Sequence, residues 1–426
     1  MRSDGYRAVG RSIIVGLIIL ALSLLSVYAE APIDPQEIEK AVAKGVQALL
    51  EKQVPSRALE LVVYTLLQAG VPKTNPVLQS RFQEILTSEL RLTYNVSLLA
   101  IALEKYDRKE HQDKIALCAQ ALVDGQCVNG QWSYQSKFRQ DLGMGFAVAP
   151  APDTLKKTRH RKATQSDDTV DSSENSTETA QNSETTSATT KPTEPERPAE
   201  IITVVRTKKP QQKTGDNPST ENALSGLWAA VRSGVVIPEE TWKNAAAALK
   251  EQQRRDGSWS YGRSELKDIE KRGDGCMTGA SLYGLAIAEH FLKEDIGDDE
   301  VVRKGLAWFI GKIRFDDNPG TGYDNFIYFG RPKALHYCYL YNIQRVAALF
   351  NLTKINNYDW YQEGARYLLD HQKKDGSWNE PADDLWSPPI ADTCFAILFL
   401  KKDCAGLELV SLNGFFIKPA DGPKPK

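Results

Sequence analysis

Apolar residues recur every three or four positions along most of the chain, which is the spacing of one buried face of an α-helix. The first clear case runs from Ile38 to Leu50. The same spacing predicts helices over 59–67, 96–103, 115–122, 223–231, 242–249, 282–291, 302–313, 340–350, 361–369 and 395–400. No stretch shows sustained strand alternation bounded by hairpin turns. The pattern therefore predicts an all-α protein.

A short unit repeats along this helical pattern. Residues 252–259 (QQRRDGSW) and 371–378 (HQKKDGSW) match closely, and 126–132 (QCVNGQW) is a weaker third copy. Trp259 and Trp378 are 119 residues apart, or two periods of about 60. Residues 320–323 fall midway and resemble a degenerate copy.

Each copy has a physical reason to follow a helix. The Asp-Gly pair supplies the left-handed residue that ends a helix and reverses the chain. The glutamine can bond carbonyls freed at that end, and the tryptophan can cover the turn against the next, more apolar helix. Hairpins repeated in this way could close into a ring with one set of helices inside and the other outside.

The composition changes sharply from about residue 153 to 214. Residues 164–190 contain no aromatic residue and only one larger aliphatic, Val170. Such a segment cannot bury enough apolar area to offset its ordering entropy, so we expect 150–215 to be a disordered insertion. It divides the repeat array into 36–135 and 216–404, with 405–426 as a C-terminal tail.

The N-terminus has the layout of an export signal. Arg2, Arg7 and Arg11 precede an uncharged run from Ser12 to Ala29, and Val27 and Ala29 suit a cleavage site. The run is slightly short for a membrane span, but an uncleaved anchor stays open. Either alternative places the body outside the cytosol, as a periplasmic, secreted or membrane-anchored protein. Any membrane contact is then expected only through residues 1–29.

The charge balance and the cysteine spacing disfavour some classes of function. The 53 Lys+Arg against 55 Asp+Glu disfavour nucleic acid as a partner, because phosphate recognition normally needs a basic patch. Six cysteines form no CxxC pair, so a zinc knuckle is not expected. Cys118 and Cys127 are the most local disulfide candidates, and buried free thiols are the alternative.

The repeat resembles that of squalene cyclases and protein prenyltransferase β subunits. Their "QW" pattern is matched by Gly364, Tyr367, Gln372, Gly376 and Trp378, and the segments at Lys44-Gly45 and 304–309 look like openings of the same motif. The likeness is closest to exported bacterial proteins with prenyltransferase/squalene-oxidase repeats, of the planctomycete type. It implies a single α/α toroid of about six helical hairpins.

The resemblance implies two possible reactions, and the residues that each reaction needs can be sought in this sequence. Class II cyclases protonate an alkene with an acid that would stand at Ala391, just before Asp392-Thr393, and alanine cannot supply a proton. Prenyltransferases bind zinc through an Asp-x-Cys pair and a histidine, which Asp274, Cys276 and His336 resemble. The alternative makes Asp274 an N-cap, Cys276 a packed thiol and His336 a hydrogen-bonded residue.

The starts of the inner helices would form the rim of a central cavity. Aromatic and polar groups around an apolar funnel are typical of a small-molecule site. The candidate rim residues are Tyr94, Asp216, Asn217, Asp274, Cys276, His336, Tyr337, Tyr339 and Asp392. Three functions follow as hypotheses. The first is binding of an isoprenoid, another apolar ligand or an envelope protein partner in the cavity. The second is a zinc-dependent prenyltransferase-like or isoprenoid-acting enzyme, and the third is a structural protein of the cell envelope.

Overall fold

The computed structural model describes residues 31–87, 92–134, 156–159, 200–262, 273–321, 333–380 and 388–402. These ranges are mostly helical, as predicted, and contain twelve α-helices. No helix within them is long and apolar enough to cross a membrane. The expected signal or anchor segment, residues 164–190 and the 405–426 tail lie outside the described residues.

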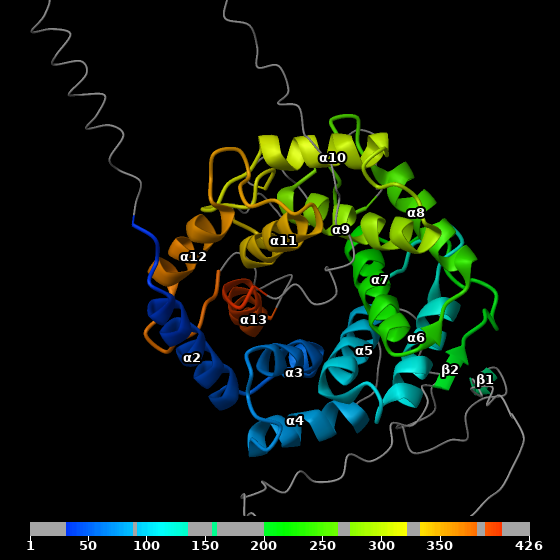
Figure 1. Ribbon diagram of the computed structural model, residues 1–426, viewed down its shortest axis with the longest axis horizontal. Coiled ribbons are helices and arrows are strands. Elements are labelled where there is room, and N and C mark those ends of the chain that lie inside the picture. The colour runs from blue at the N-terminus through cyan, green and yellow to red at the C-terminus, as the bar shows by residue number, and fades with distance from the viewer. Residues whose placement is uncertain are drawn as a thin grey trace, which may run out of the picture.

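The helices form two layers, one inside the other (Figure 1). The outer layer consists of α2 (Pro35–Glu51), α4 (Pro76–Thr87), α6 (Gln112–Gly125), α8 (Glu239–Gln252), α10 (Glu300–Gly311) and α12 (Trp360–His371). The inner layer consists of α3 (Leu59–Gln68), α5 (Thr93–Asp107), α7 (Asn217–Arg232), α9 (Gly275–Leu292), α11 (His336–Leu349) and α13 (Pro389–Leu400). A 3₁₀ turn at Ser56–Ala58 leads into α3.

Each inner helix packs against the next inner helix in chain order, and α13 packs against α3. The last inner helix thus contacts the first, and it also contacts α2. Inner helices are enclosed on most sides, and in α9 every residue from 275 to 289 is buried. Outer helices such as α12 bury only the stripe that faces inward. This difference explains why the second helix of each predicted hairpin is the more apolar one.

The three tryptophan turns make the same hydrogen bonds. Each indole Nε1 donates to a carbonyl ten residues earlier, in the last turn of the outer helix: Leu122 (2.7 Å), Leu249 (2.8 Å) and Leu368 (2.7 Å). These carbonyls have no partner within their own helices. Each tryptophan backbone N–H donates to a threonine hydroxyl in the following inner helix: Thr220, Thr278 and Thr393. Every copy therefore joins an outer helix to its inner partner.

The glutamines of the three turns join one hairpin to the next. The Nε2 atoms of Gln126, Gln253 and Gln372 donate to the turn glycine and to a carbonyl of another outer helix. For Gln372 that second carbonyl belongs to Ala41, 331 residues earlier in the chain and in α2 (2.8 Å). The last copy of the motif is thus bonded to the first helix.

The turn glycines cannot be replaced without strain. Gly257 and Gly376 have φ of +92° and +82°, and a Cβ at either position would strike the carbonyl of Lys304 or Lys44. The residues after these lysines, Gly305 and Gly45, lie against Trp259 and Trp378, as expected of motif openings. The degenerate copy is different, because Gly320 has φ of +89° but faces the carbonyl of Gly273 instead of an outer helix.

A small sheet lies outside the helical layers and was not predicted. Strand β2 (Glu200–Thr203) pairs antiparallel with β1 (Lys156–Arg159) and parallel with β3 (Val235–Val236). The prediction of disorder up to residue 215 is therefore wrong for residues 200–215. This segment buries Ile202 and Val204, and the Val205 carbonyl accepts a hydrogen bond from Gln120 (2.6 Å).

We predict that Trp259→Phe destabilises the protein by about 1–3 kcal/mol, because it leaves the buried Leu249 carbonyl without its donor. The half-buried Trp308 has no hydrogen bond to its indole nitrogen within the described residues, so Trp308→Phe is the matched control. Urea unfolding of both variants measures the difference. Equal losses would show that the indole hydrogen bond contributes nothing.

Candidate functional site

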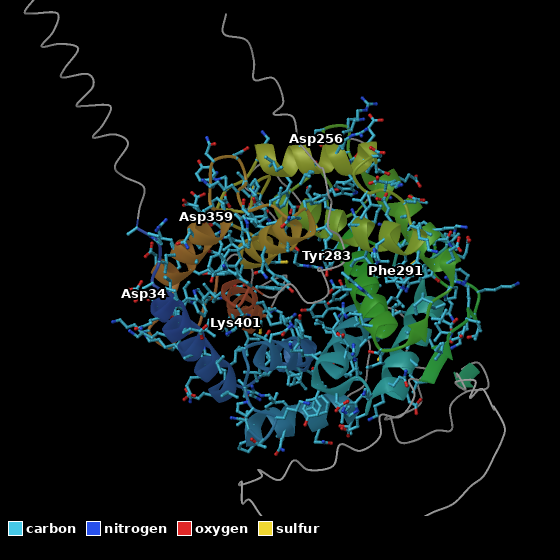
Figure 2. All side chains as sticks on the ribbon, in the orientation of Figure 1. Asp34, Asp256, Tyr283, Phe291, Asp359 and Lys401 are labelled. Carbon is cyan, nitrogen blue, oxygen red and sulfur yellow. The ribbon has the colours of Figure 1, made fainter. Side chains whose placement is uncertain are left out.

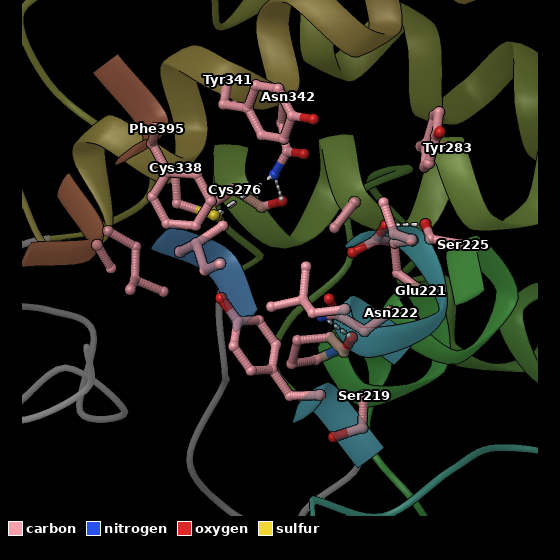
Figure 3. A pocket seen from close by; sticks show the side chains of 18 of the residues that line it. Ser219, Glu221, Asn222, Ser225, Cys276, Tyr283, Cys338, Tyr341, Asn342 and Phe395 are labelled. Atoms are coloured by element: carbon pink, nitrogen blue, oxygen red, sulfur yellow. Dashed lines mark hydrogen bonds between the residues drawn. The ribbon is translucent and has the colours of Figure 1, made fainter. Parts of the chain in front are cut away.

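The inner helices surround a cavity of about 490 Å³ (Figure 3). All six contribute side chains to its wall, among them Leu61, Leu98, Trp228, Tyr283, Tyr341 and Phe395. Within one helix the lining positions follow helical spacing, as Cys276, Ala280 and Tyr283 do in α9. The cavity therefore forms where the inward stripes of the six inner helices meet.

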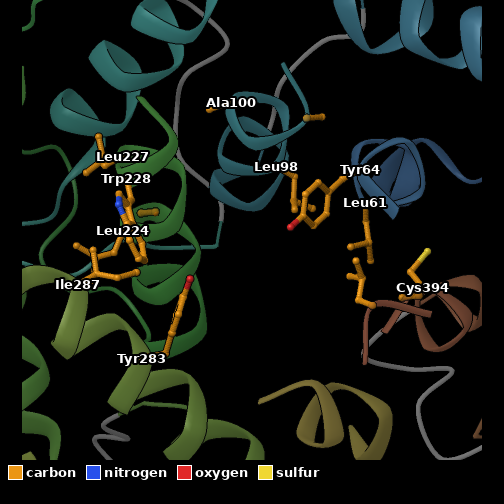
Figure 4. Close-up of a cluster of buried hydrophobic side chains, with 14 of the residues drawn as sticks. Leu61, Tyr64, Leu98, Ala100, Leu224, Leu227, Trp228, Tyr283, Ile287 and Cys394 are labelled. Carbon is orange, nitrogen blue, oxygen red and sulfur yellow. The ribbon is translucent and has the colours of Figure 1, made fainter. Parts of the chain in front are cut away.

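Most of this wall is apolar. Figure 4 shows Leu61 and Tyr64 on α3 beside Leu98 on α5, at the inner surface. Leu224 and Leu227 belong to the buried cluster that continues behind the wall and joins the two layers. The apolar surface of the cavity is thus continuous with the core.

A buried ion pair lies in this wall. The Arg345 guanidinium of α11 donates to the Glu221 carboxylate of α7. Ser225 Oγ donates to the same carboxylate at 2.8 Å, and Asn342 Oδ1 accepts from Arg345 at 3.1 Å. Both charged residues are under 10% exposed. The charges are therefore largely matched before any ligand arrives.

Two tyrosines cover the guanidinium. Arg345 lies 3.5 Å from the ring centroid of Tyr283 and 5.3 Å from that of Tyr341. Burial lowers the pKa of Arg345, but the charge of Glu221, the two tyrosines and the hydrogen bond to Glu221 together outweigh burial, so the pKa is raised overall. Burial raises the pKa of Tyr283. This part of the wall therefore combines an ion pair with two aromatic rings.

Asn342 connects the ion pair to two thiols. Its Nδ2 donates to the Cys276 carbonyl at 3.0 Å and lies 3.5 Å from Cys276 Sγ. Cys276 Sγ lies 3.0 Å from Cys338 Sγ, and both residues line the cavity (Figure 3). Glu221, Asn342 and Cys338 were not singled out as site residues from the sequence. Their positions on the inward stripes of α7 and α11 were the signal that could have found them.

Of the nine candidate rim residues, Tyr94 and Cys276 line the cavity. Burial raises the pKa of Tyr94 well above its usual value. The other seven are not among its lining residues: Asp216, Asn217, Asp274, His336, Tyr337, Tyr339 and Asp392. The physical reason is that these side chains bond or pack against the chain that enters the helix, whereas neighbouring positions of the same first turns, such as Pro218, Cys276 and Ala391, point into the cavity.

Asp216 and Asp274 are N-caps. Their carboxylates accept from the backbone N–H groups of Ser219 (2.8 Å) and Met277 (3.0 Å). Asn217 next to the first cap accepts from Gln131 and donates to the Ser260 carbonyl. These residues hold the entry of α7 and α9, as the capping alternative predicts for Asp274.

The expected zinc ligands are not brought together. Within the described ranges no three His, Cys, Asp or Glu side chains are placed to hold a metal ion. Asp274 caps α9, Cys276 faces Cys338, and the His336 Nε2 lies 3.1 Å from the Phe315 carbonyl. Burial lowers the pKa of His336 to about 3, so its ring is neutral at physiological pH. The residues present do not fit the zinc site.

The remaining candidates are also structural. Tyr339 is fully buried, and its hydroxyl accepts from the Arg314 backbone at 3.4 Å. Tyr337 is buried beside His336. Asp392 accepts from the Glu380 backbone at 2.8 Å. Each of the three belongs to the packing around the start of α11 or α13.

Two further sequence expectations concern chemistry. Cys118 and Cys127 are free and buried, so the local disulfide is not formed and the buried-thiol alternative holds for both. Ala391, at the position of the cyclase acid, is a lining residue. A carboxyl group there would face the cavity, and this chain offers a methyl group instead.

Compared with known proteins, the chain matches no family model and no curated protein at a significant level.

We predict that Arg345→Met destabilises the protein by about 3–5 kcal/mol, because Glu221 is left buried and unpaired. The double variant Arg345→Met/Glu221→Leu removes both charges and recovers most of that loss. Urea unfolding of the single and double variants provides the cycle. Additive losses would show that the two side chains do not act as a pair.

Proposed function

We propose that the chain forms an α/α toroid of the terpenoid-cyclase/prenyltransferase type and binds an elongated apolar molecule in the central cavity. The observation that carries this proposal is the cavity itself, built by inward stripes from all six inner helices. The three turns with matching glutamine and tryptophan hydrogen bonds support the toroid assignment. The shape of the cavity does not select isoprenoids over other apolar molecules. Isoprenoid chains are the first probes to test, because the repeat resembles that of proteins that act on isoprenoids.

The size and chemistry of the cavity suit a small ligand better than a protein segment. A volume of about 490 Å³ lies within the range of sites that bury drug-sized molecules, about 300–1,000 Å³. The polar side chains Glu221, Asn342 and Arg345 already bond one another. A ligand therefore needs few polar groups of its own, since its binding energy comes mainly from apolar contact.

Binding without proton-transfer chemistry is the role that these residues support. Ala391 replaces the cyclase acid, and Glu221, the one lining carboxylate in the described chain, is bonded to Arg345. A general acid must be free to give its proton to the reacting group. Glu221 already accepts hydrogen bonds from Arg345 and Ser225, so it is not free to act as a general acid.

Arg57 suggests where a polar end of the ligand would lie. It lines the cavity yet is exposed, so it stands where the cavity meets solvent. A ligand with its chain inside and a hydroxyl or acidic group near Arg57 satisfies both environments.

We also propose, from the N-terminal pattern alone, that the protein acts outside the cytosol.

We predict that Ala280→Trp, which places an indole inside the cavity, weakens binding of farnesol or geranylgeraniol at least tenfold, or about 1.4 kcal/mol. Calorimetric titration gives the affinity, and a negative heat-capacity change marks apolar burial. The matched control is Ala307→Trp on the exposed side of α10, which leaves binding unchanged.

Both variants are first checked for wild-type unfolding midpoints. If neither alcohol nor a fatty acid of similar length binds the wild-type protein, or if Ala280→Trp binds as the control does, the proposed function is wrong.

A further inference from the structure

Two cysteines from neighbouring inner helices meet in the cavity wall. Cys276 lies in the first turn of α9 and Cys338 in the first turn of α11. Their Sγ atoms are 3.0 Å apart, although 62 residues separate them in the chain. Neither the zinc-ligand hypothesis nor the proposed ligand site uses this pair.

The separation of the sulfur atoms is about 1 Å longer than a disulfide bond of about 2.05 Å. The helices that carry them pack directly on each other. The two sulfurs therefore need to approach by only about 1 Å to reach bonding distance. Cys118, Cys127 and Cys394 are also thiols in the described part of the chain, but no sulfur–sulfur contact joins them there.

The two thiols differ in access. Cys276 is fully buried, whereas Cys338 is partly exposed and both line the cavity. A small reagent that enters the cavity meets Cys338 first. Cys276 then stands behind it, close enough to attack the sulfur that has reacted.

We propose that Cys276 and Cys338 form a redox-active dithiol that closes to a disulfide in the cavity wall. The oxidant is a low-molecular-weight disulfide, R–S–S–R. The Cys338 thiolate attacks it, forming a mixed disulfide and releasing one R–SH after proton uptake. The Cys276 thiolate then displaces the second R–SH. Two S–H bonds are lost, one S–S bond forms, and two electrons and two protons reduce the reagent.

Oxidation has two structural consequences. It links α9 to α11 covalently, which restricts the unfolded chain and raises the unfolding temperature. It also changes the sulfur atoms next to Asn342, whose Nδ2 lies 3.5 Å from Cys276 Sγ and 3.9 Å from Cys338 Sγ. Since Asn342 also accepts from Arg345, the dithiol is connected to the buried ion pair through Asn342.

The experiment treats the folded, full-length protein with 2-hydroxyethyl disulfide, blocks the remaining thiols and digests with trypsin. We expect the peptides 273–293 and 334–345 to be joined within one chain, with the link removed by dithiothreitol. The oxidised wild-type protein unfolds several degrees higher than the reduced form. Cys276→Ser lacks this gain and traps the reagent on Cys338, whereas Cys338→Ser lacks the gain and takes up no reagent at Cys276.

Cys127→Ser is the matched control and keeps both the link and the gain in unfolding temperature. The proposal is overturned if wild-type Cys338 holds the reagent as a stable adduct while Cys276 stays free to alkylate. It is overturned equally if the link joins two chains, or if neither thiol reacts in the folded protein while both react in urea.

Discussion

The structure depends on the hydrogen bonds that each tryptophan turn makes with three different helices. The indole satisfies a carbonyl at the end of one outer helix, the backbone N–H bonds a threonine of the next inner helix, and the glutamine bonds a further outer helix. The indole and threonine hydrogen bonds are buried, and those of Gln253 and Gln372 are partly buried. A buried carbonyl without a donor is costly, so each of these bonds fixes the groups that it joins. One turn therefore sets the placement of an outer helix, its inner partner and the hairpin that follows.

The cavity follows from this constraint. Once Gln372 bonds the Ala41 carbonyl and α13 packs on α3, the inward stripes of the inner helices face one another. Polar groups on those stripes must then find partners among themselves, as Glu221 and Arg345 do. The same convergence brings Cys276 and Cys338 together from adjacent helices. A ligand site and a dithiol are thus two outcomes of one arrangement.

The features that could be predicted from the sequence are those determined locally. The helical spacing of apolar residues predicted the helices, and the Asp-Gly pairs predicted the turns that follow them. The Lys304-Gly305 pair was predicted to open a copy of the motif, and Gly305 lies against Trp259. The cap at Asp274 was one of the two alternatives for that residue, and its signal lies within one turn of helix. The strand at 200–203 also had a local signal, the β-branched run Ile201-Ile202-Thr203-Val204-Val205. This run was overlooked because the whole polar segment 150–215 was assigned to a disordered insertion.

The site was harder to predict because it depends on how helices rotate about their axes. The start of each inner helix was taken as the rim. Asp216, Asp274 and Asp392 bond backbone groups at these starts instead, and neighbouring positions on another side of the helix line the cavity. The pairings of Glu221 with Arg345 and of Cys276 with Cys338 join residues 124 and 62 positions apart. No spacing rule within one helix reveals such pairs.

Closure of the helical layers is the claim on which the cavity rests, and zero-length carbodiimide coupling tests it directly. Lys52 Nζ, just after α2, lies 2.9 Å from Asp375 Oδ2, just after α12. Coupling of the monomer should yield one peptide that links Lys52 to Asp375. Its yield should be comparable to that of the link between Lys250 in α8 and Asp299, the N-cap of α10, whose charged atoms are 2.7 Å apart. If the Lys250 link forms and the Lys52 link does not, the first and last hairpins are separate and the closed arrangement is wrong.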